Sequence, residues 1–364
     1  MKIAVNAVLA YEQPRGVGNY LNAILPALAK IDKINEYYIY YGKWMGNYGF
    51  TKIKQDNFHL IELDINNGQI KRNLFLAIKL PQMVKRIKAD IYWVPDSQAT
   101  FIKPCKMIST IHDLAEFEVP EKYSPKTAMI RRMYIRRQVR LSDRIITVSE
   151  YSKKDICSRF GLSDKKVVVT YAALSETISK QVQTEPEDYF LCVGEIERAK
   201  NLRKLIEAYI MLDDDTKQRY GIKAVGRHGN CYDEIIDLIG SNGIGDKVKL
   251  YGYLSNEEIN DMYARAYAFV FPSLFEGFGL PVLEAMVRGV PVLCSNVSSI
   301  PEVGGDAVLT FDPHDAGSIC EQLKKIIDND DLRKEMIEKG LVRSRLFSID
   351  NVAQKTHEVI TDIC

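Results

Sequence analysis

Two glutamates bracket a glycine-rich turn in the second half of the chain, in the stretch FPSLFEGFGLPVLE over residues 271–284. Pro281 suits the first turn of a helix, so a helix is expected to begin near Leu280. The backbone N–H groups of Gly279 and Leu280 would then lie at the positive end of that helix, where a diphosphate binds readily. A carboxylate is unfavourable beside phosphate unless it accepts hydrogen bonds, and sugar hydroxyls are natural donors for Glu276 and Glu284. Either glutamate alone is typical of an ordinary helix start, but the whole pattern predicts a site for a sugar diphosphate.

This turn requires a frame of alternating strands and helices, and the hydrophobic pattern predicts one throughout the chain. Buried strands are expected at residues 2–9, 37–41, 91–94, 107–111, 144–148, 166–170, 189–193, 222–225, 248–251, 269–271, 291–294 and 308–311. Helices are expected at residues 18–30, 74–88, 126–141, 149–160, 201–211, 231–241, 256–266, 280–288, 316–329 and 349–363. Such alternation is typical of parallel sheets with right-handed crossovers, whose ligands bind at the carboxyl ends of strands.

The charge distribution divides the chain into two parts. Residues 1–182 contain 29 Lys/Arg and 17 Asp/Glu, a balance of +12, whereas residues 183–364 contain 20 and 31, a balance of −11. We therefore predict an α/β protein of two doubly wound, Rossmann-like domains, residues 1–182 and 183–348. The last helix, about 349–364, is expected to pack back on the first domain.

Composition suggests a cytoplasmic protein. No charged-then-apolar leader opens the sequence, and no apolar run approaches the roughly 18–20 residues that span a bilayer. The seven cysteines are scattered without CxxC spacing, which favours reduced thiols over disulfides or structural zinc.

The glycine-rich stretch resembles the signature of the retaining GT-B glycosyltransferases of family 4 (glycosyl transferases group 1), and most closely their mannosyltransferase-like members. Further motifs support the resemblance in order and spacing: RGVGNY at 15–20, IHDL at 111–114, TVSEYS at 147–152, CVG at 192–194, KNL at 200–202, YGYL at 251–254 and SSIPE at 298–302. The resemblance implies an acceptor-binding first domain and a nucleotide-sugar-binding second domain that face each other across a cleft.

The resemblance also implies roles for individual residues of the second domain. Glu284 would hold the ribose hydroxyls of the donor, and Glu276 would contact the transferred sugar. Lys200 would neutralise the diphosphate, while the amides from Phe278 to Leu280 would bind the sugar or the diphosphate. Tyr253 is also expected among the donor-binding residues.

Two segments of the first domain are expected to complete the donor site. By the same resemblance, the Gly16–Gly18 loop would close over the phosphates and His112 would touch the sugar near the reacting carbon, so that His112, Glu276 and Lys200 form the catalytic set. A lone histidine at a strand end is also typical of a structural residue. The two glycines could suggest a dinucleotide fingerprint, but Leu21 occupies the place of its third glycine, which argues against a Rossmann oxidoreductase.

Leaving-group stabilisation is expected without a metal ion or cofactor. Fixed amides and Lys200 can stabilise the charge that builds on the departing diphosphate. A retaining hydrolase needs two carboxylates close together, and the sequence offers no convincing second carboxylate for such a pair. The resemblance implies front-face attack, with the leaving phosphate taking the acceptor proton. The acidic run Asp213–Asp215 has DxD spacing, but its place after a helix favours a solvated helix terminus over a manganese site.

One departure from the family pattern concerns the residue before Lys200. Many relatives have arginine there, whereas this chain has Ala199, with Arg198 one place earlier. Arg198 either takes over the donor-binding role from this neighbouring position or points to solvent.

Two basic stretches of the first domain suggest a partner surface. Arg131, Arg132, Arg136, Arg137 and Arg140 lie on one expected helix, and Lys79, Lys85, Arg86 and Lys88 lie on another. Such a surface suits either ordinary solvation or peripheral contact with anionic lipid at the inner face of a membrane. A nucleic-acid partner is not expected, because no binding motif or stacking platform accompanies the charge.

The predicted reaction is hexose transfer, with GDP-mannose as donor and a saccharide or lipid-linked saccharide as acceptor, in polysaccharide or glycolipid synthesis. Two alternatives remain at this point. One is a non-hydrolysing nucleotide-sugar epimerase of the same fold, and the other is a non-catalytic protein that binds sugar nucleotides.

Overall fold

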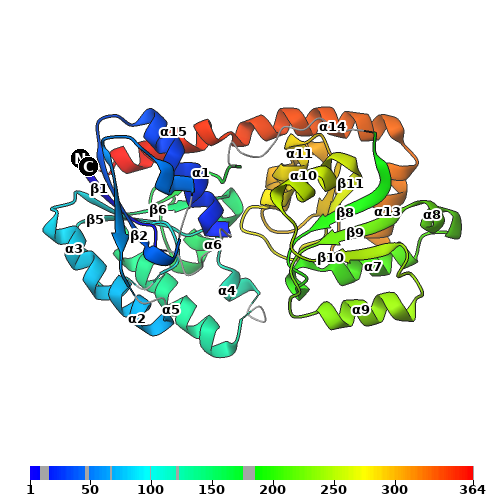
Figure 1. Cartoon of the computed structure of the whole chain (residues 1–364), viewed down its shortest axis with the longest axis horizontal. Helices are drawn as coiled ribbons and strands as arrows, with labels where there is room; N and C mark the ends of the chain where they lie inside the picture. The colour runs from blue at the N-terminus through cyan, green and yellow to red at the C-terminus, as the bar shows by residue number, and fades with distance from the viewer. Residues whose placement is uncertain are drawn as a thin grey trace. The chain divides into compact units, whose positions relative to one another are not determined.

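The computed structural model describes residues 1–8, 16–45, 49–65, 68–98, 100–119, 123–174 and 185–363. The chain divides into two compact units, drawn in Figure 1. The first unit comprises Met1–Glu176 and Phe347–Cys364, and the second comprises Thr177–Leu346. The predicted boundary between residues 182 and 183 lies in the segment 175–184, outside the described residues.

The first unit is built on a seven-stranded parallel sheet of order β3-β2-β1-β4-β5-β6-β7. Its strands are β1 (Lys2–Asn6), β2 (Glu36–Gly42), β3 (Phe58–Leu63), β4 (Ile91–Val94), β5 (Lys106–Thr110), β6 (Arg144–Thr147) and β7 (Val167–Val169). The order of connection reverses between β1 and β4, and ligands of doubly wound sheets bind at the carboxyl end of such a switch point.

Helices cover both faces of this sheet because alternate strand residues point to opposite sides. The helices are α1 (Gly16–Ile31), α2 (Gln69–Leu74), the π-helical turn η3 (Phe75–Lys79), α3 (Leu80–Arg86), α4 (Ala115–Glu118), α5 (Pro125–Leu141), α6 (Glu150–Phe160) and α15 (Ile349–Thr361), with short 3₁₀ turns η1 (Lys43–Met45) and η2 (Gly49–Lys52). From β1, Val5 packs into the core formed with α1 and α15, whereas Ala4 packs into the core formed with α3.

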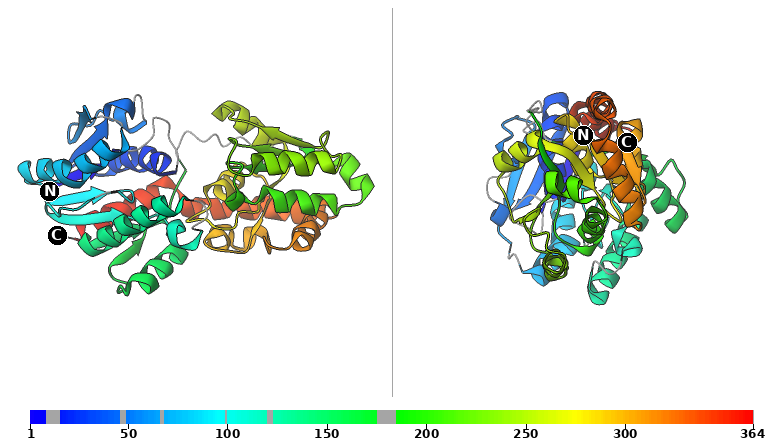
Figure 2. Two further views of the ribbon diagram at one scale, coloured as in Figure 1. Left: turned by 90° about the horizontal axis from the view of Figure 1, so that it is seen from below. Right: turned by 90° about the vertical axis from the view of Figure 1, so that its right-hand side faces the viewer.

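The last helix, α15, packs on α1 in the first unit (Figures 1 and 2). The buried carboxylate of Asp32, just after α1, lies 3.0 Å from His357 Nε2 and accepts hydrogen bonds from Asn35 and Tyr37 at 2.8 Å each. Burial alone would raise the pKa of Asp32, but the hydrogen bonds from Asn35, Tyr37 and the Ile34 amide outweigh it and lower that pKa. Asp32 therefore holds the end of α1 to both β2 and α15.

The second unit contains a six-stranded parallel sheet of order β10-β9-β8-β11-β12-β13. Its strands are β8 (Glu187–Val193), β9 (Gly221–Val225), β10 (Val248–Tyr251), β11 (Ala266–Phe271), β12 (Val292–Ser295) and β13 (Val308–Phe311). Its helices are α7 (Leu202–Ile210), α8 (Asp214–Arg219), α9 (Tyr232–Ser241), α10 (Asn256–Arg265), α11 (Leu280–Val287), α12 (Ile300–Gly304), α13 (Ala316–Ile327) and α14 (Asp330–Ser344), with 3₁₀ turns η5 (Arg198–Lys200), η6 (Gly305–Ala307) and η7 (Arg345–Phe347). Here the switch point lies between β8 and β11.

The predicted α/β class with two doubly wound parallel sheets is confirmed, and several details differ from the prediction. Strand β3, helix α14 and the short helices α4, α8 and α12 were not predicted. The helix predicted at 74–88 begins earlier, at Gln69, and passes through the π-helical turn η3. The helix predicted to begin at Gly18 begins at Gly16, so the expected Gly16–Gly18 loop is the first turn of α1, and residues 9–15 lie outside the described part.

Two further observations concern the whole described chain. Within the residues that the structure describes, no helix is both long and apolar enough to cross a bilayer. Six of the seven cysteines are free thiols, and Cys364 lies outside the described residues.

Candidate active site

The glycine-rich turn connects β11 to α11 at the switch point of the second sheet. Gly279 caps α11 with a φ of 105°, a left-handed conformation that favours glycine. Within the described residues, no acceptor is recorded for the backbone N–H groups of Gly279 and Leu280. Both donors therefore stand at the N-terminal end of α11, where helix geometry favours an anion.

Lys200 and Glu276 form an ion pair beside this turn. Lys200 Nζ lies 2.5 Å from Glu276 Oε1, and the two side chains are 22% and 16% exposed. Lys200 comes from η5, which follows β8, so the two ends of strands that meet at the switch point supply the pair. The Lys200 ammonium also lies 5.6 Å from the centre of the Phe271 ring. A cation and a carboxylate thus stand together where a sugar diphosphate was predicted.

Three serines that the sequence analysis did not single out for a role hold this turn in place. Ser273 Oγ donates to Glu276 Oε1 at 2.6 Å and thereby orients the carboxylate that pairs with Lys200. Ser298 Oγ accepts from the Glu276 N–H at 3.1 Å, and Ser299 Oγ lies 2.8 Å from the Glu276 carbonyl oxygen and 3.0 Å from that of Phe278. Ser273 and Ser299 are fully buried. The motif SSIPE was therefore a usable signal, because its serines support the turn.

The η5 segment is fastened to the same turn through its backbone. Leu274 N–H donates to the Ala199 carbonyl oxygen at 2.8 Å, and Asn201 Nδ2 donates to the carbonyls of Pro272 and Pro313 at 3.1 and 2.8 Å. Asn201 adopts a left-handed conformation with φ 57°, which asparagine tolerates better than most residues. These bonds fix the position from which Lys200 reaches Glu276.

Glu284 lies one turn along α11, beside Tyr263 and Arg288. Its Oε2 lies 3.4 Å from the hydroxyl of the buried Tyr263, on α10. Burial raises the pKa of Glu284, and the positive charge of Arg288 opposes that rise. Arg288 is itself buried: it donates to the Glu284 carbonyl oxygen at 2.7 Å, and its Nε and Nη2 lie 3.2 and 2.5 Å from Asn260 Oδ1.

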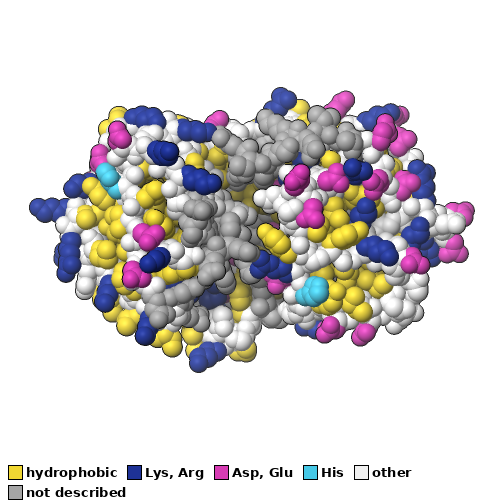
Figure 3. All heavy atoms as spheres, viewed as in Figure 1, with side chains coloured by type: hydrophobic (Ala, Val, Ile, Leu, Met, Phe, Trp, Pro, Cys, Tyr) yellow, Lys and Arg dark blue, Asp and Glu magenta, His cyan; other side chains and the backbone are white. Residues whose placement is uncertain are grey.

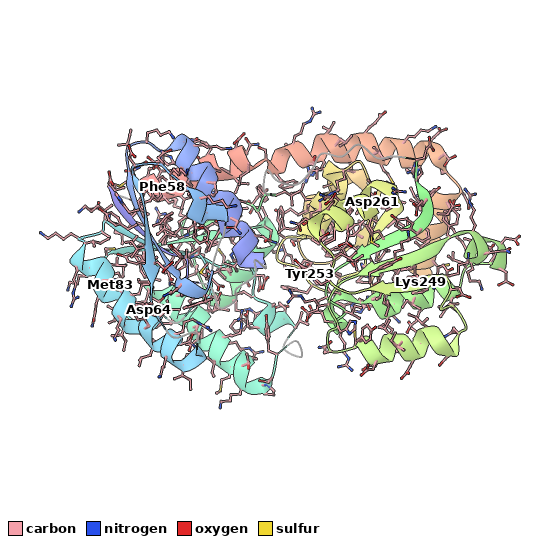
Figure 4. The ribbon with its side chains drawn as sticks, in the orientation of Figure 1. Phe58, Asp64, Met83, Lys249, Tyr253 and Asp261 are labelled. Atoms are coloured by element: carbon pink, nitrogen blue, oxygen red, sulfur yellow. The ribbon has the colours of Figure 1, made fainter. Side chains whose placement is uncertain are left out.

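Two of the predicted donor-binding residues contact side chains other than Lys200 and Glu276. The Arg198 guanidinium is 60% exposed and pairs with Glu234 on α9. Tyr253 follows β10, is 70% exposed, and its ring centre lies 5.2 Å from the Arg227 guanidinium carbon (Figure 4). A cavity of about 860 Å³ adjoins this end of β10, lined by Tyr251, Leu254, Glu257, Glu258, Asn260, Asp261 and Met262. Asn260 thus borders that cavity and also holds Arg288.

His112 lies in the first unit, just beyond the carboxyl end of β5. Its Nε2 lies 3.1 Å from the Pro95 carbonyl oxygen, which can only accept, so Nε2 is the donor of this hydrogen bond and Nδ1 is the ring nitrogen left for another partner. The Tyr20 ring from α1 meets the imidazole edge-on, with centroids 5.0 Å apart and planes at 86°. The GVGNY segment therefore contributes a ring that orients His112, with Gly16 four residues and Gly18 two residues earlier on α1.

The acidic run at 213–215 forms the start of α8. Asp213 caps the helix by accepting from Thr216 N at 2.9 Å and Thr216 Oγ1 at 2.8 Å, and Asp214 pairs with Lys217. In the described part of the chain, no group of three or more His, Cys, Asp or Glu side chains is arranged to hold a metal ion.

Solved structures with this architecture define the fold class. HepE from Anabaena in complex with UDP-glucose aligns over 100% of both chains with a TM-score of 0.77 and 17% identity. WaaG, a glycosyltransferase involved in lipopolysaccharide biosynthesis, aligns over 99% of both chains with a TM-score of 0.74 and 16% identity. At this identity the likeness concerns the fold, and it confirms the GT-B fold class.

Sequence comparison then places the chain in a family. Residues 14–174 match Glycosyltransferase Family 4 and residues 175–343 match Glycosyl transferases group 1. Among curated relatives, O-antigen chain mannosyltransferase B from Escherichia coli is 32% identical over 262 residues, 69% of each chain. The chain belongs to the family 4, group 1 glycosyltransferases, and the predicted mannosyltransferase-like resemblance is confirmed.

Two more distant relatives carry informative names. The serotype-specific mannosyltransferase WbdA of Escherichia coli is 28% identical over 274 residues, 71% of this chain but only 34% of that longer protein. A Campylobacter jejuni enzyme named N-acetylgalactosamine-N,N'-diacetylbacillosaminyl-diphospho-undecaprenol 4-alpha-N-acetylgalactosaminyltransferase is 25% identical over 77% of this chain and 78% of its own.

Proposed function

We propose that this glycosyltransferase transfers mannose from GDP-mannose, with retention of configuration and without a metal ion, to a saccharide acceptor of a cell-surface polysaccharide. The main support for the donor site is the Lys200–Glu276 ion pair beside the backbone N–H donors of Gly279 and Leu280. Lys200 and these donors bind the diphosphate, where they stabilise the charge of the leaving group. The names of the mannosyltransferase relatives support mannose as the transferred sugar.

The remaining site residues take the roles that their surroundings allow. Glu284 accepts hydrogen bonds from the ribose hydroxyls, and Glu276 accepts them from the transferred sugar once the diphosphate has engaged Lys200. His112 presents Nδ1 to a sugar hydroxyl, because its other nitrogen is held by Pro95. Of the proposed donor-binding residues, Arg198 contributes least to donor binding, since its guanidinium pairs with Glu234.

The proposed reaction uses these residues as follows. The bond from the anomeric carbon to the diphosphate oxygen breaks, and the acceptor oxygen bonds to the same face of the sugar. The acceptor proton passes to the departing phosphate oxygen. The positive charge of Lys200 lowers the free energy of the transition state because it lies where negative charge grows.

A basic surface of the first unit supports a second part of the proposal, peripheral contact with an anionic membrane. Residues 65–89 contain six Lys/Arg and residues 122–142 contain seven, with no Asp or Glu in either range. The same segments expose Ile70, Leu74, Ile78, Met129 and Met133. Figure 3 shows basic and apolar side chains together over the lower left part of the first unit, where Figure 1 draws α2, α3 and α5. Apolar side chains ringed by positive charge are typical of proteins that rest on anionic lipid.

Transfer assays test the donor and the reaction together. Wild-type protein is incubated with GDP-mannose, UDP-glucose or UDP-galactose, with and without EDTA, and with or without a mannose-terminated acceptor. We expect an α-linked mannosyl product from GDP-mannose, unchanged by EDTA and absent without acceptor. Product from a UDP-sugar alone, loss of activity in EDTA, or an inverted anomeric centre would each contradict part of the proposal, and donor conversion without acceptor would indicate an epimerase.

For the membrane surface, binding to anionic vesicles in a flotation assay should fall with added salt. Binding that does not depend on lipid charge would contradict the proposed membrane contact.

A further inference from the structure

An arginine cluster surrounds one aromatic ring of the first unit. Phe117, on α4, is half-buried and packs against the core formed by α5, α6 and β6. The guanidinium carbons of Arg132, Arg136 and Arg159 lie 5.3, 5.6 and 5.0 Å from its ring centre. Two of these arginines come from α5 and the third comes from α6, so three separate elements bring the groups together.

The arginines of this cluster differ in their acidic partners. Arg159 pairs with Glu118 and Asp155, and the neighbouring Arg131 pairs with the buried Glu116 at 2.5 Å. Arg132 donates one N–H, from Nε, to the Glu116 carbonyl oxygen at 2.6 Å.

The other two arginines keep most of their hydrogen-bonding capacity. Among the described residues, Arg136 has no hydrogen-bond or ion-pair partner, and Arg132 has no carboxylate partner. An aromatic ring attracts a guanidinium without using any of its N–H donors. Within the described part of the chain, Arg132 therefore keeps four donors and Arg136 keeps five, together with two positive charges that no described carboxylate neutralises.

Crowded guanidinium groups of this kind suit a phosphate. A guanidinium presents paired N–H donors that match the spacing of phosphate oxygens, and such charge-assisted bonds are about twice as strong as neutral ones. The helix α5 carries no acidic residue along its whole length, so no side chain of its own competes for the site. An incoming dianion would also relieve the mutual repulsion of Arg132 and Arg136.

The position of the cluster indicates which molecule carries the phosphate. Helix α4 begins three residues after His112, at the carboxyl edge of the first sheet, where acceptor chemistry is proposed. The donor diphosphate has its own proposed partners, Lys200 and the α11 donors, in the second unit. The first unit is the proposed acceptor domain, so a phosphate bound at this cluster fits the acceptor.

We propose that Arg132 and Arg136, held against Phe117, bind the diphosphate that links an acceptor saccharide to its lipid carrier. This inference rests on the proposed glycosyltransfer and adds the chemical class of the acceptor. The name of the Campylobacter relative, which includes a diphospho-undecaprenol, is compatible with this class. The cluster selects acceptors that still carry the carrier-linked diphosphate.

The test compares two acceptors with the same terminal saccharide, one linked to a lipid diphosphate and one to a phosphate-free alkyl chain. The variants are Arg132→Gln and Arg136→Gln, and the matched control is Lys154→Gln, which removes one exposed charge from α6. Since Arg136 makes no hydrogen bond or ion pair with a described residue, its substitution should leave folding intact. Assays run in neutral detergent, without anionic lipid.

We expect KM for the diphosphate acceptor to rise at least about tenfold in both arginine variants. KM for the phosphate-free acceptor, and kcat with either one, should stay within about twofold of wild type, and Lys154→Gln should change neither. Equal KM changes for the two acceptors, or none, would overturn the proposal. If instead these variants only weaken binding to anionic vesicles, the arginines serve lipid headgroups and the proposal is wrong.

A binding measurement separates this inference from the proposed activity. If wild-type protein transfers no sugar to either acceptor, geranyl diphosphate is titrated by calorimetry in the presence of excess nucleoside diphosphate, which occupies the second unit. Weaker binding by at least about tenfold in Arg132→Gln and Arg136→Gln, but not in Lys154→Gln, supports the diphosphate site on its own. Equal affinities in all four proteins would refute it.

Discussion

Removing the Lys200 ammonium gives the sharpest prediction about the donor site. In the structure this group lies 2.5 Å from Glu276 Oε1, and neither side chain is more than a quarter exposed. Lys200→Met removes the cation proposed for the diphosphate and leaves the Glu276 carboxylate facing the incoming anion. A hydrogen bond to a charged group contributes about 1.5–3 kcal/mol, so the affinity for nucleoside diphosphate should fall roughly ten- to a hundredfold.

The partner substitution should act in the opposite direction. Glu276→Gln frees Lys200 from its ion pair, so we expect binding of the nucleoside diphosphate to be unchanged or tighter while sugar transfer slows by at least about tenfold, or 1.4 kcal/mol. In the double variant the repelling carboxylate is gone, so its affinity for nucleoside diphosphate should exceed that of Lys200→Met alone. A double-mutant cycle by calorimetry measures this coupling. Wild-type affinity in Lys200→Met, or equal losses in both single variants, would refute the reasoning.

Four further predictions concern neighbouring features. Arg288→Met should raise the pKa of Glu284 further. As the solution is acidified, nucleotide affinity, measured by calorimetry, should therefore begin to fall at a higher pH in the variant than in wild type. A 2',3'-dideoxynucleotide should show no such difference. Gly279→Ala should cost about 1–2 kcal/mol in urea denaturation, because φ is 105° there, although no atom crowds the new methyl group; an unchanged midpoint would contradict this. Asp32→Asn should lower the free energy of unfolding. Because the pKa of Asp32 is lower in the folded than in the unfolded protein, the stability difference between variant and wild type should be constant above about pH 5 and shrink as pH falls below about 4. A stability difference that grows in acid would contradict the assignment. Arg198→Ala should weaken nucleotide binding less than Lys200→Met does, because Arg198 already pairs with a carboxylate on α9.

Hydrophobic periodicity predicted every described strand except β3, including the partly exposed edge strands β10 and β13. Strand β11 is buried along its whole length, and its apolar run is plain in the sequence. Strand β3 forms the edge of the first sheet, and His59 and Glu62 interrupt its short apolar run. Helix α14 was missed because charged residues interrupt its apolar positions and few of its side chains are buried.

The site was predictable where it depends on local backbone and unpredictable where it depends on packing. The spacing of Glu276, Gly279 and Pro281 fixes a strand, a turn and a helix start within a few residues, and the structure contains them. The contact of Glu284 with Tyr263 joins α10 to α11, and its geometry depends on how the two helices pack.

The Arg198–Glu234 pair likewise joins residues 36 positions apart in the chain. Sequence spacing alone could not determine whether Arg198 faces the diphosphate or α9, since both directions are open to a long, exposed side chain.

The most direct test of the central claim is a crystal structure with a bound nucleoside diphosphate. The account predicts phosphate oxygens within about 3 Å of the backbone nitrogens of Gly279 and Leu280 and of Lys200 Nζ, with the ribose hydroxyls on Glu284. A nucleotide whose phosphates lie away from the N-terminal end of α11, with the Lys200–Glu276 ion pair undisturbed, would contradict it.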